Sequence, residues 1–322
     1  MKYSLILIFA LLFALNLGGG NFAASFVAAR GGGIISHLKS SILFLIFAVA
    51  GAVILGGPVT RTLSREIVAS RWIDLDVCLV ILIAATGSLF AANRLQLPQS
   101  SSLVTVGAIV GAGLYLGKVN FRVFAYLLPF WILLPVAGFF LTRTLGRMIY
   151  PPRKGNFWIY EKVVSHRKRL KTFVILASCY NAFACGSNNV ANVVGPLAGA
   201  QIVSPLLGLA LLAPIFGLGG LVFPGMLKTA AEKIVPLGLL TATLLCLVSG
   251  TLMLLSSSLG IPQSFVMVKM SSLFAIGSLK AEDRAIWKNP LIVKTSLAWV
   301  VMPVIATVVS YLLIGGWRAL SA

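Results

Sequence analysis

The chain carries two diverged copies of one sequence unit. Matching segments recur in the same order, at spacings of 167, 167 and 164 residues. Each copy places small and amide-bearing residues inside apolar sequence, a pattern typical of membrane transporters whose binding site lies between two repeats. The matching segments are residues 19–25 and 186–192, residues 62–68 and 229–235, and residues 97–100 and 261–264.

The composition requires a lipid environment. Hydrophobic residues make up 59% of the 322 residues, charged residues make up 10%, and the mean hydropathy is +1.00. Several apolar stretches approach the length that spans a bilayer. We therefore expect an all-α polytopic protein of the plasma membrane. The stretches are residues 42–55, 77–92, 124–141, 206–222, 237–255 and 297–314.

The repeat defines the domain organisation. We expect a first transmembrane repeat at residues 1–149, a basic cytoplasmic linker at 150–171, and a second transmembrane repeat at 172–322. Each copy contains about five membrane segments, some of them broken. An odd number of crossings per copy would invert the second repeat relative to the first, and we favour that inverted topology, with both termini outside.

Residues 2–17 have the charge and apolar run of a signal peptide. The equivalent segment of copy two lies inside the chain, so we expect a helix of the fold instead.

The net charge of +19 reflects membrane topology. Basic residues gather in the connections, above all between positions 143 and 171, as cytoplasmic loops do. A charge run beside apolar spans is a topology signal more often than a nucleic-acid site. We therefore expect the lipid bilayer as a partner and no nucleic acid.

Each copy contains a Pro-Gln-Ser element that breaks a helix. Pro98 and Pro262 lack an N–H and disfavour helix in the preceding residue. The apolar stretches that follow, residues 103–116 and 265–276, are short for a full crossing. We expect re-entrant helical hairpins there, because broken helices at membrane depth survive only inside protein or beside a water-lined cavity.

Polar side chains in these patches form the candidate site. Carboxamides, hydroxyls and free helix N-termini can all donate hydrogen bonds to an anion. The alternative for the asparagines is hydrogen bonding between helices, and an intramembrane lysine can also reach the membrane interface. The predicted anion-binding residues are Asn21, Ser25, Gln99, Ser100, Ser101, Ser102, Asn188, Asn189, Asn192, Gln263, Ser264 and Lys269.

The chain lacks the groups of a membrane enzyme. All seven acidic residues and both histidines, His37 and His166, map to connections. No acid–base pair, metal-ligand cluster or nucleophile triad falls in an apolar segment. The four cysteines form no CxxC pair and are expected to be buried small residues. We expect no cofactor, no metal and no enzymatic activity.

At these motifs the chain resembles the PiT family of inorganic phosphate transporters. That family repeats Gly-Ala-Asn-Asp-x-Ala-Asn and Pro-x-Ser-Thr-Thr-His elements in two inverted halves. Here Phe22 and Asn189 occupy the aspartate positions, and Leu103 and Met267 the histidine positions. The resemblance implies a hydroxyl-lined anion site, and the lost aspartates argue against the family's sodium coupling. The chain is most similar to the sulfate-permease branch.

The chemistry of the anion supports that branch. Phosphate keeps a proton near neutral pH and benefits from an acceptor, whereas sulfate needs donors only and is repelled by a carboxylate. We expect a proton-coupled permease for sulfate. A phosphate transporter coupled to sodium or protons is the alternative, followed by a gated pore and then by a lipid-modifying enzyme. A homodimer is compatible with the sequence.

Overall fold

The computed structural model describes residues 1–95, 99–150, 153–223, 238–280 and 290–321. Within these ranges regular structure is helical, as predicted, apart from an isolated bridge between Val68 and Val119. Among the described residues, seven helices are long and apolar enough to cross a membrane. They are α1 (Lys2–Gly31), α2 (His37–Leu55), α4 (Leu75–Arg94), α6 (Phe121–Ile149), α10 (Pro205–Val222), α12 (Leu239–Ser258) and α15 (Pro290–Ser321).

Further helices complete each copy. Helix α8 (Arg167–Asn189) ends at a break at Val190, and α9 (Ala191–Gly199) continues it. Helices α5 (Ser101–Tyr115) and α13 (Phe265–Lys280) begin directly after the Pro-Gln-Ser elements, where helix breaks are predicted. The remaining pieces are α3 (Gly57–Arg61), η1 (Thr62–Glu66), η2 (Ser70–Trp72), α7 (Phe157–Ile159) and η3 (Tyr160–Val164).

The two copies have matching helices and matching contacts. In order, α1, α2, α4, α5 and α6 correspond to α8–α9, α10, α12, α13 and α15. Helix α1 packs on α10 as α8 packs on α2, and α5 packs on α15 as α13 packs on α6. Each short helix therefore packs against the last span of the other copy.

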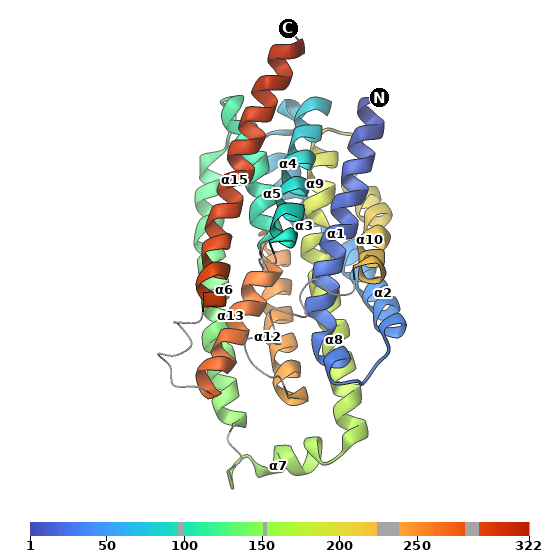
Figure 1. Cartoon of the computed structure of the whole chain (residues 1–322), viewed down its shortest axis with the longest axis vertical. Helices are drawn as coiled ribbons and strands as arrows, with labels where there is room; N and C mark the ends of the chain where they lie inside the picture. Colours follow the sequence, from blue (N-terminus) through green and yellow to red (C-terminus); the bar gives the residue numbers. More distant parts are fainter. Residues whose placement is uncertain (96–98, 151–152, 224–237, 281–289, 322) are drawn as a thin grey trace.

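The ends of the chain lie at one end of the bundle, opposite the linker (Figure 1). Lys2 and Arg318 form ion pairs with Asp76 and Asp74 at the start of α4. Helix α1 runs away from that end and α8 runs towards it (Figure 1), the opposite directions that an inverted repeat requires of this pair. The inverted relation of the whole copies stays a prediction.

Glycines let helices of the two copies touch along their backbones. A Cβ on Gly18 of α1 would collide with the carbonyl oxygen of Phe216 in α10. In the equivalent contact between α8 and α2, a Cβ on Gly186 would collide with the carbonyl oxygen of Ala48. Small residues at such crossings allow the close packing that holds helices together in lipid.

Some predicted features fall outside the described residues. They are Pro98, the repeat segment 229–235, residues 151–152 of the linker, and the acidic residues Glu232, Glu282 and Asp283. The other four acidic residues lie in or beside short connecting elements or at the start of α4.

Candidate anion-binding site

The two short helices begin with the same capping geometry. The Ser100 hydroxyl accepts a hydrogen bond from Leu103 N at 3.1 Å. In the other copy, the Ser264 hydroxyl accepts from Met267 N, also at 3.1 Å. The first N–H groups of a helix lack intrahelical acceptors and form the positive end of its dipole. Each copy therefore contributes one helix N-terminus suited to an anion.

The two N-termini meet between the copies. The Ser102 hydroxyl, in the first turn of α5, donates to the carbonyl oxygen of Gln263 at 2.9 Å. Gln263 lies just before α13, so the start of one short helix contacts the approach to the other. Figure 1 places α5 and α13 in opposite halves of the bundle. The sequence-predicted hydroxyls of both repeats are thus brought to one place.

Asparagines from the two repeat motifs join this meeting point. Asn189 Nδ2 donates to Asn21 Oδ1 at 2.7 Å, and these two residues occupy nearly equivalent repeat positions. Asn192 Nδ2 donates to the Ser102 hydroxyl at 3.0 Å. The structure therefore brings together Asn21, Ser102, Asn189 and Asn192, which we name the central cluster.

Asn188 has a different position from its neighbour. Its Nδ2 lies 3.2 and 3.1 Å from the hydroxyls of Ser256 and Ser257, and 3.0 Å from the carbonyl oxygen of Ile261. Its Oδ1 accepts from Gln263 N at 2.9 Å. The bonds to Ile261 and Gln263 hold the non-helical segment before α13, and those to Ser256 and Ser257 tie it to the end of α12. Asn188 therefore positions that segment.

Several predicted residues keep buried polar atoms without a protein partner. Among the described residues, no hydrogen-bond partner is found for Ser25 Oγ, Gln99 Oε1, Asn192 Oδ1, or either amide atom of Gln263. An unmade buried hydrogen bond costs about 1–3 kcal/mol. The N and O of a carboxamide exchange by rotation, so each amide can turn its NH₂ group to a bound anion.

Lys269 supplies the one buried cationic group among the predicted site residues. It lies on α13, five residues after the Ser264 cap, and is 7% exposed. Lys269 Nζ lies 3.2 Å from Cys246 Sγ, and that sulfur lies 3.7 Å from the carbonyl oxygen of Ser25. A buried ammonium group is costly without a counter-charge, and these neighbours provide none.

The position of the missing first aspartate is filled by aromatic packing. Phe22 is fully buried, and its ring centroid lies 5.5 Å from those of His37 and Phe44. The Arg30 guanidinium lies 5.4 Å from the same ring. Within the described ranges, no group of three histidine, cysteine or acidic side chains could hold a metal ion. The described residues around Phe22 therefore offer no carboxylate that could bind a cation.

Three residues of α12 that were not among the predicted site residues also contribute. Ser256 and Ser257 bind Asn188, and Cys246 contacts Lys269. The run Ser256-Ser257-Ser258 just before the Pro-Gln-Ser element was an available signal. All twelve predicted site residues are at most 7% exposed, so the site is closed to both sides in this conformation.

Comparison with known proteins places the chain in a family. The model of the phosphate transporter family matches residues 17–154 and 153–310. The sulfate permease CysP of Bacillus subtilis (strain 168) is 33% identical over 311 residues, covering 96% of this chain and 86% of that protein. A solved structure, the sodium-dependent phosphate transporter, shares the fold with a TM-score of 0.84 at 20% identity, covering 99% of both chains. The chain therefore belongs to the phosphate transporter family and is a multi-pass membrane permease, as the sequence predicted.

Proposed function

We propose that this permease is a secondary active transporter for sulfate, driven by protons. The observation that carries the proposal is the chemistry of the central cluster. Two helix N-termini, carboxamides and hydroxyls converge there, and Lys269 adds one positive charge nearby. No carboxylate contacts these residues within the described part of the chain.

A site of this kind favours a fully ionised oxyanion. Sulfate carries no proton near neutral pH, so every one of its oxygens accepts. The central cluster can supply donors from Ser102, Asn189 and Asn192, and each unmatched donor would cost about 1–3 kcal/mol. The similarity to a protein named as a sulfate permease supports the same substrate.

Phosphate is the second candidate, and one observation favours it. Asn192 Oδ1 and Gln263 Oε1 are buried acceptors without a partner among the described residues. A protonated oxyanion could donate to either of them, whereas sulfate could not. The fold match to a sodium-dependent phosphate transporter concerns the fold alone.

The coupling proposal rests on the aspartate positions. Phe22 is enclosed by aromatic rings, and Asn189 is a neutral amide bonded to Asn21. Sodium prefers oxygen ligands, carboxylates above all, and these positions offer no carboxylate. A proton does not need a set of oxygen ligands of this kind, and we therefore propose protons as the coupling ion.

Transport would require the closed site to open to each side in turn. Repeat-built transporters do this by rocking one part against another around a fixed site. The cross-copy contact between Ser102 and Gln263 would be remade in each cycle.

Uptake by proteoliposomes tests the proposal. Purified protein is reconstituted, and accumulation of labelled sulfate and labelled phosphate is measured under a pH gradient, a sodium gradient, or neither. We expect saturable sulfate uptake that needs the pH gradient and ignores sodium. Preference for phosphate would refute the substrate, sodium dependence would refute the coupling, and accumulation of neither anion would refute both.

A further inference from the structure

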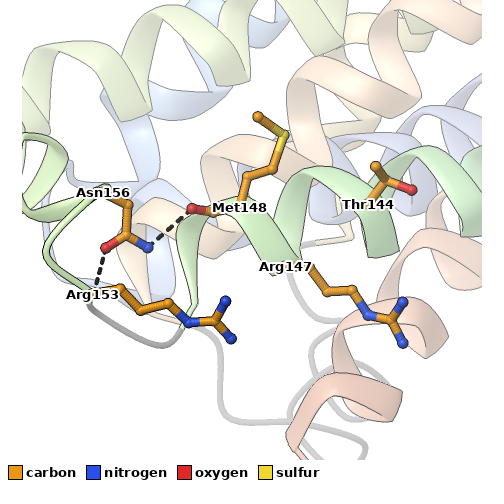
Figure 2. Close-up of a pocket in the computed structure, with 6 residues that line it drawn as sticks. Thr144, Arg147, Met148, Arg153 and Asn156 are labelled. Atoms are coloured by element: carbon orange, nitrogen blue, oxygen red, sulfur yellow. Dashed lines mark hydrogen bonds between the residues drawn. The ribbon is translucent and has the colours of Figure 1, made fainter.

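A cavity outside the central cluster lies where α6 meets the linker. It measures about 540 Å³ and is lined by Thr144, Arg147, Met148, Arg153, Gly155 and Asn156. Figure 2 shows the side chains of Arg147, from the last turns of α6, and Arg153, from the linker, extending to the same side of the helix end. The end of α6 and the linker lie at the end of the bundle opposite the chain termini (Figure 1), and the cavity is lined by residues of both.

Hydrogen bonds hold this part of the linker in place. Asn156 is 8% exposed, and its Nδ2 donates to the carbonyl oxygens of Met148 and Ile149 at 3.0 Å each. Its Oδ1 accepts from Arg153 N at 2.6 Å (Figure 2). These bonds cap the end of α6 and tie the backbone of Arg153 to it, at the edge of the cavity.

Tyr160 makes a further hydrogen bond to the end of α6. Its hydroxyl donates to the carbonyl oxygen of Ile149 at 2.6 Å. Burial, and secondly the neighbouring Tyr150, raise the pKa of Tyr160, so the donor proton is retained.

The two arginines bring positive charge to the cavity. Neither Arg147 nor Arg153 forms an ion pair within the described ranges. The described residues that line the cavity include no acidic side chain. One arginine near a helix C-terminus is explained by the helix dipole, but a second one, brought in by the linker, is not. Guanidinium groups match the geometry of phosphate oxygens and bind them through paired hydrogen bonds.

The surroundings indicate the source of that phosphate group. Phe157 and Trp158 of α7 are 58% and 57% exposed, and exposed aromatic residues of this kind mark the membrane–water interface. Met148, which lines the cavity, and Leu145 one turn earlier along α6 are also exposed. A lipid could place its phosphate between the arginines and its acyl chains along this apolar face.

We propose that this cavity binds the phosphate of an anionic glycerophospholipid. The lipid would attach the linker to the bilayer at the junction between the two repeats. A free inorganic phosphate ion could contact the same two arginines, but it has no acyl chains to pack on the exposed apolar face of α6. The inference concerns a site separate from the central cluster and does not depend on which anion is transported.

Thermal unfolding of the purified full chain tests the proposal. The midpoint is measured in nanodiscs of phosphatidylcholine as phosphatidylglycerol is added, for the wild type and the R147A/R153A variant. The K168A/R169A variant is the control, since it removes two exposed charges at the start of α8 that do not line the cavity. Sulfate and inorganic phosphate are added separately to phosphatidylcholine nanodiscs.

We expect phosphatidylglycerol to raise the midpoint of the wild type and of the control. The R147A/R153A variant should need about tenfold more phosphatidylglycerol, or more, for the same shift, because charge-assisted contacts are lost. Equal shifts in all three proteins, or none in the wild type, would overturn the proposal. An arginine-dependent shift with the free ions as large as the lipid shift would overturn the lipid source.

Discussion

Replacing Asn189 with aspartate tests the donor-only character of the central cluster. The substitution restores the acidic residue of the family motif in a side chain of nearly the same size. Asn189 is 1% exposed, and its Nδ2 donates to Asn21 Oδ1 at 2.7 Å. In Asn189→Asp an oxygen would face that acceptor, so the hydrogen bond is lost and two oxygens oppose each other.

The expected effect on sulfate is large. Losing the donor costs about 1–3 kcal/mol, or roughly 5- to 150-fold in affinity. A carboxylate about 6 Å from a dianion, at an effective dielectric constant of about 20, adds about 5 kcal/mol of repulsion. Protonation of the new carboxyl group relieves part of this. We therefore expect sulfate uptake to fall by about 100-fold or more near pH 7 and by less at pH 5.

The assay is initial-rate uptake of labelled sulfate by proteoliposomes, with KM and maximal rate measured at both pH values. Asn189→Ala removes the amide without adding charge, so its difference from Asn189→Asp isolates the charge. Asn93→Ala is the matched control, because it removes a 2.6 Å amide–amide bond to Asn16 outside the central cluster. Normal sulfate uptake by Asn189→Asp at pH 7 would show that the central cluster tolerates a carboxylate and is not a donor-only site.

Three further predictions follow from the same structure. Ser102→Ala removes the hydroxyl that joins the copies, so we expect uptake to fall about tenfold or more in a folded protein, and an unchanged KM would contradict a binding role. Lys269→Met keeps most of the side-chain length and removes the charge, so KM for sulfate should rise strongly while the thermal midpoint in detergent is retained. An unchanged KM would mean that the charge serves folding alone. Gly18→Ala should destabilise the contact with Phe216 by about 1–3 kcal/mol and lower the thermal midpoint. Gly20→Ala is the control, because a Cβ there meets nothing within 4 Å. Equal midpoints for the two variants would contradict the close contact at Gly18.

The repeat allowed much of the fold to be predicted. Helices α4 and α12 each contain 20 residues and lie at matching positions because both copies keep the same apolar length before the Pro-Gln-Ser element. The short helices α5 and α13 begin where proline removes a donor and serine can cap. These features depend on local sequence, which is why sequence alone could indicate them.

The partners of the site residues could not be predicted in the same way. Asn189 and Asn192 lie on either side of the break at Val190, yet both contact the Ser102 hydroxyl. Asn189 faces Asn21, whereas Asn188 faces α12. Periodicity assigns a side of a helix, while the neighbour on that side depends on how distant segments pack.

The sequence could not predict which helices of the two copies pack against each other either. Each short helix packs on the last span of the other copy, and no local pattern distinguishes that from packing within one copy. The contact between Ser102 and Gln263 follows from this exchange. The residues of the site were visible in the sequence, but the way they combine depends on long-range packing.

A structure determined with sulfate bound would show whether the central cluster binds the transported anion. We expect one anion between the first turns of α5 and α13, within hydrogen-bonding distance of Ser102 and of an amide from Asn189 or Asn192. The distances from the sulfate oxygens to these groups are the quantity to measure. An anion bound elsewhere along the transport path, with the hydrogen bonds within the central cluster intact, would show that the central cluster is not the binding site.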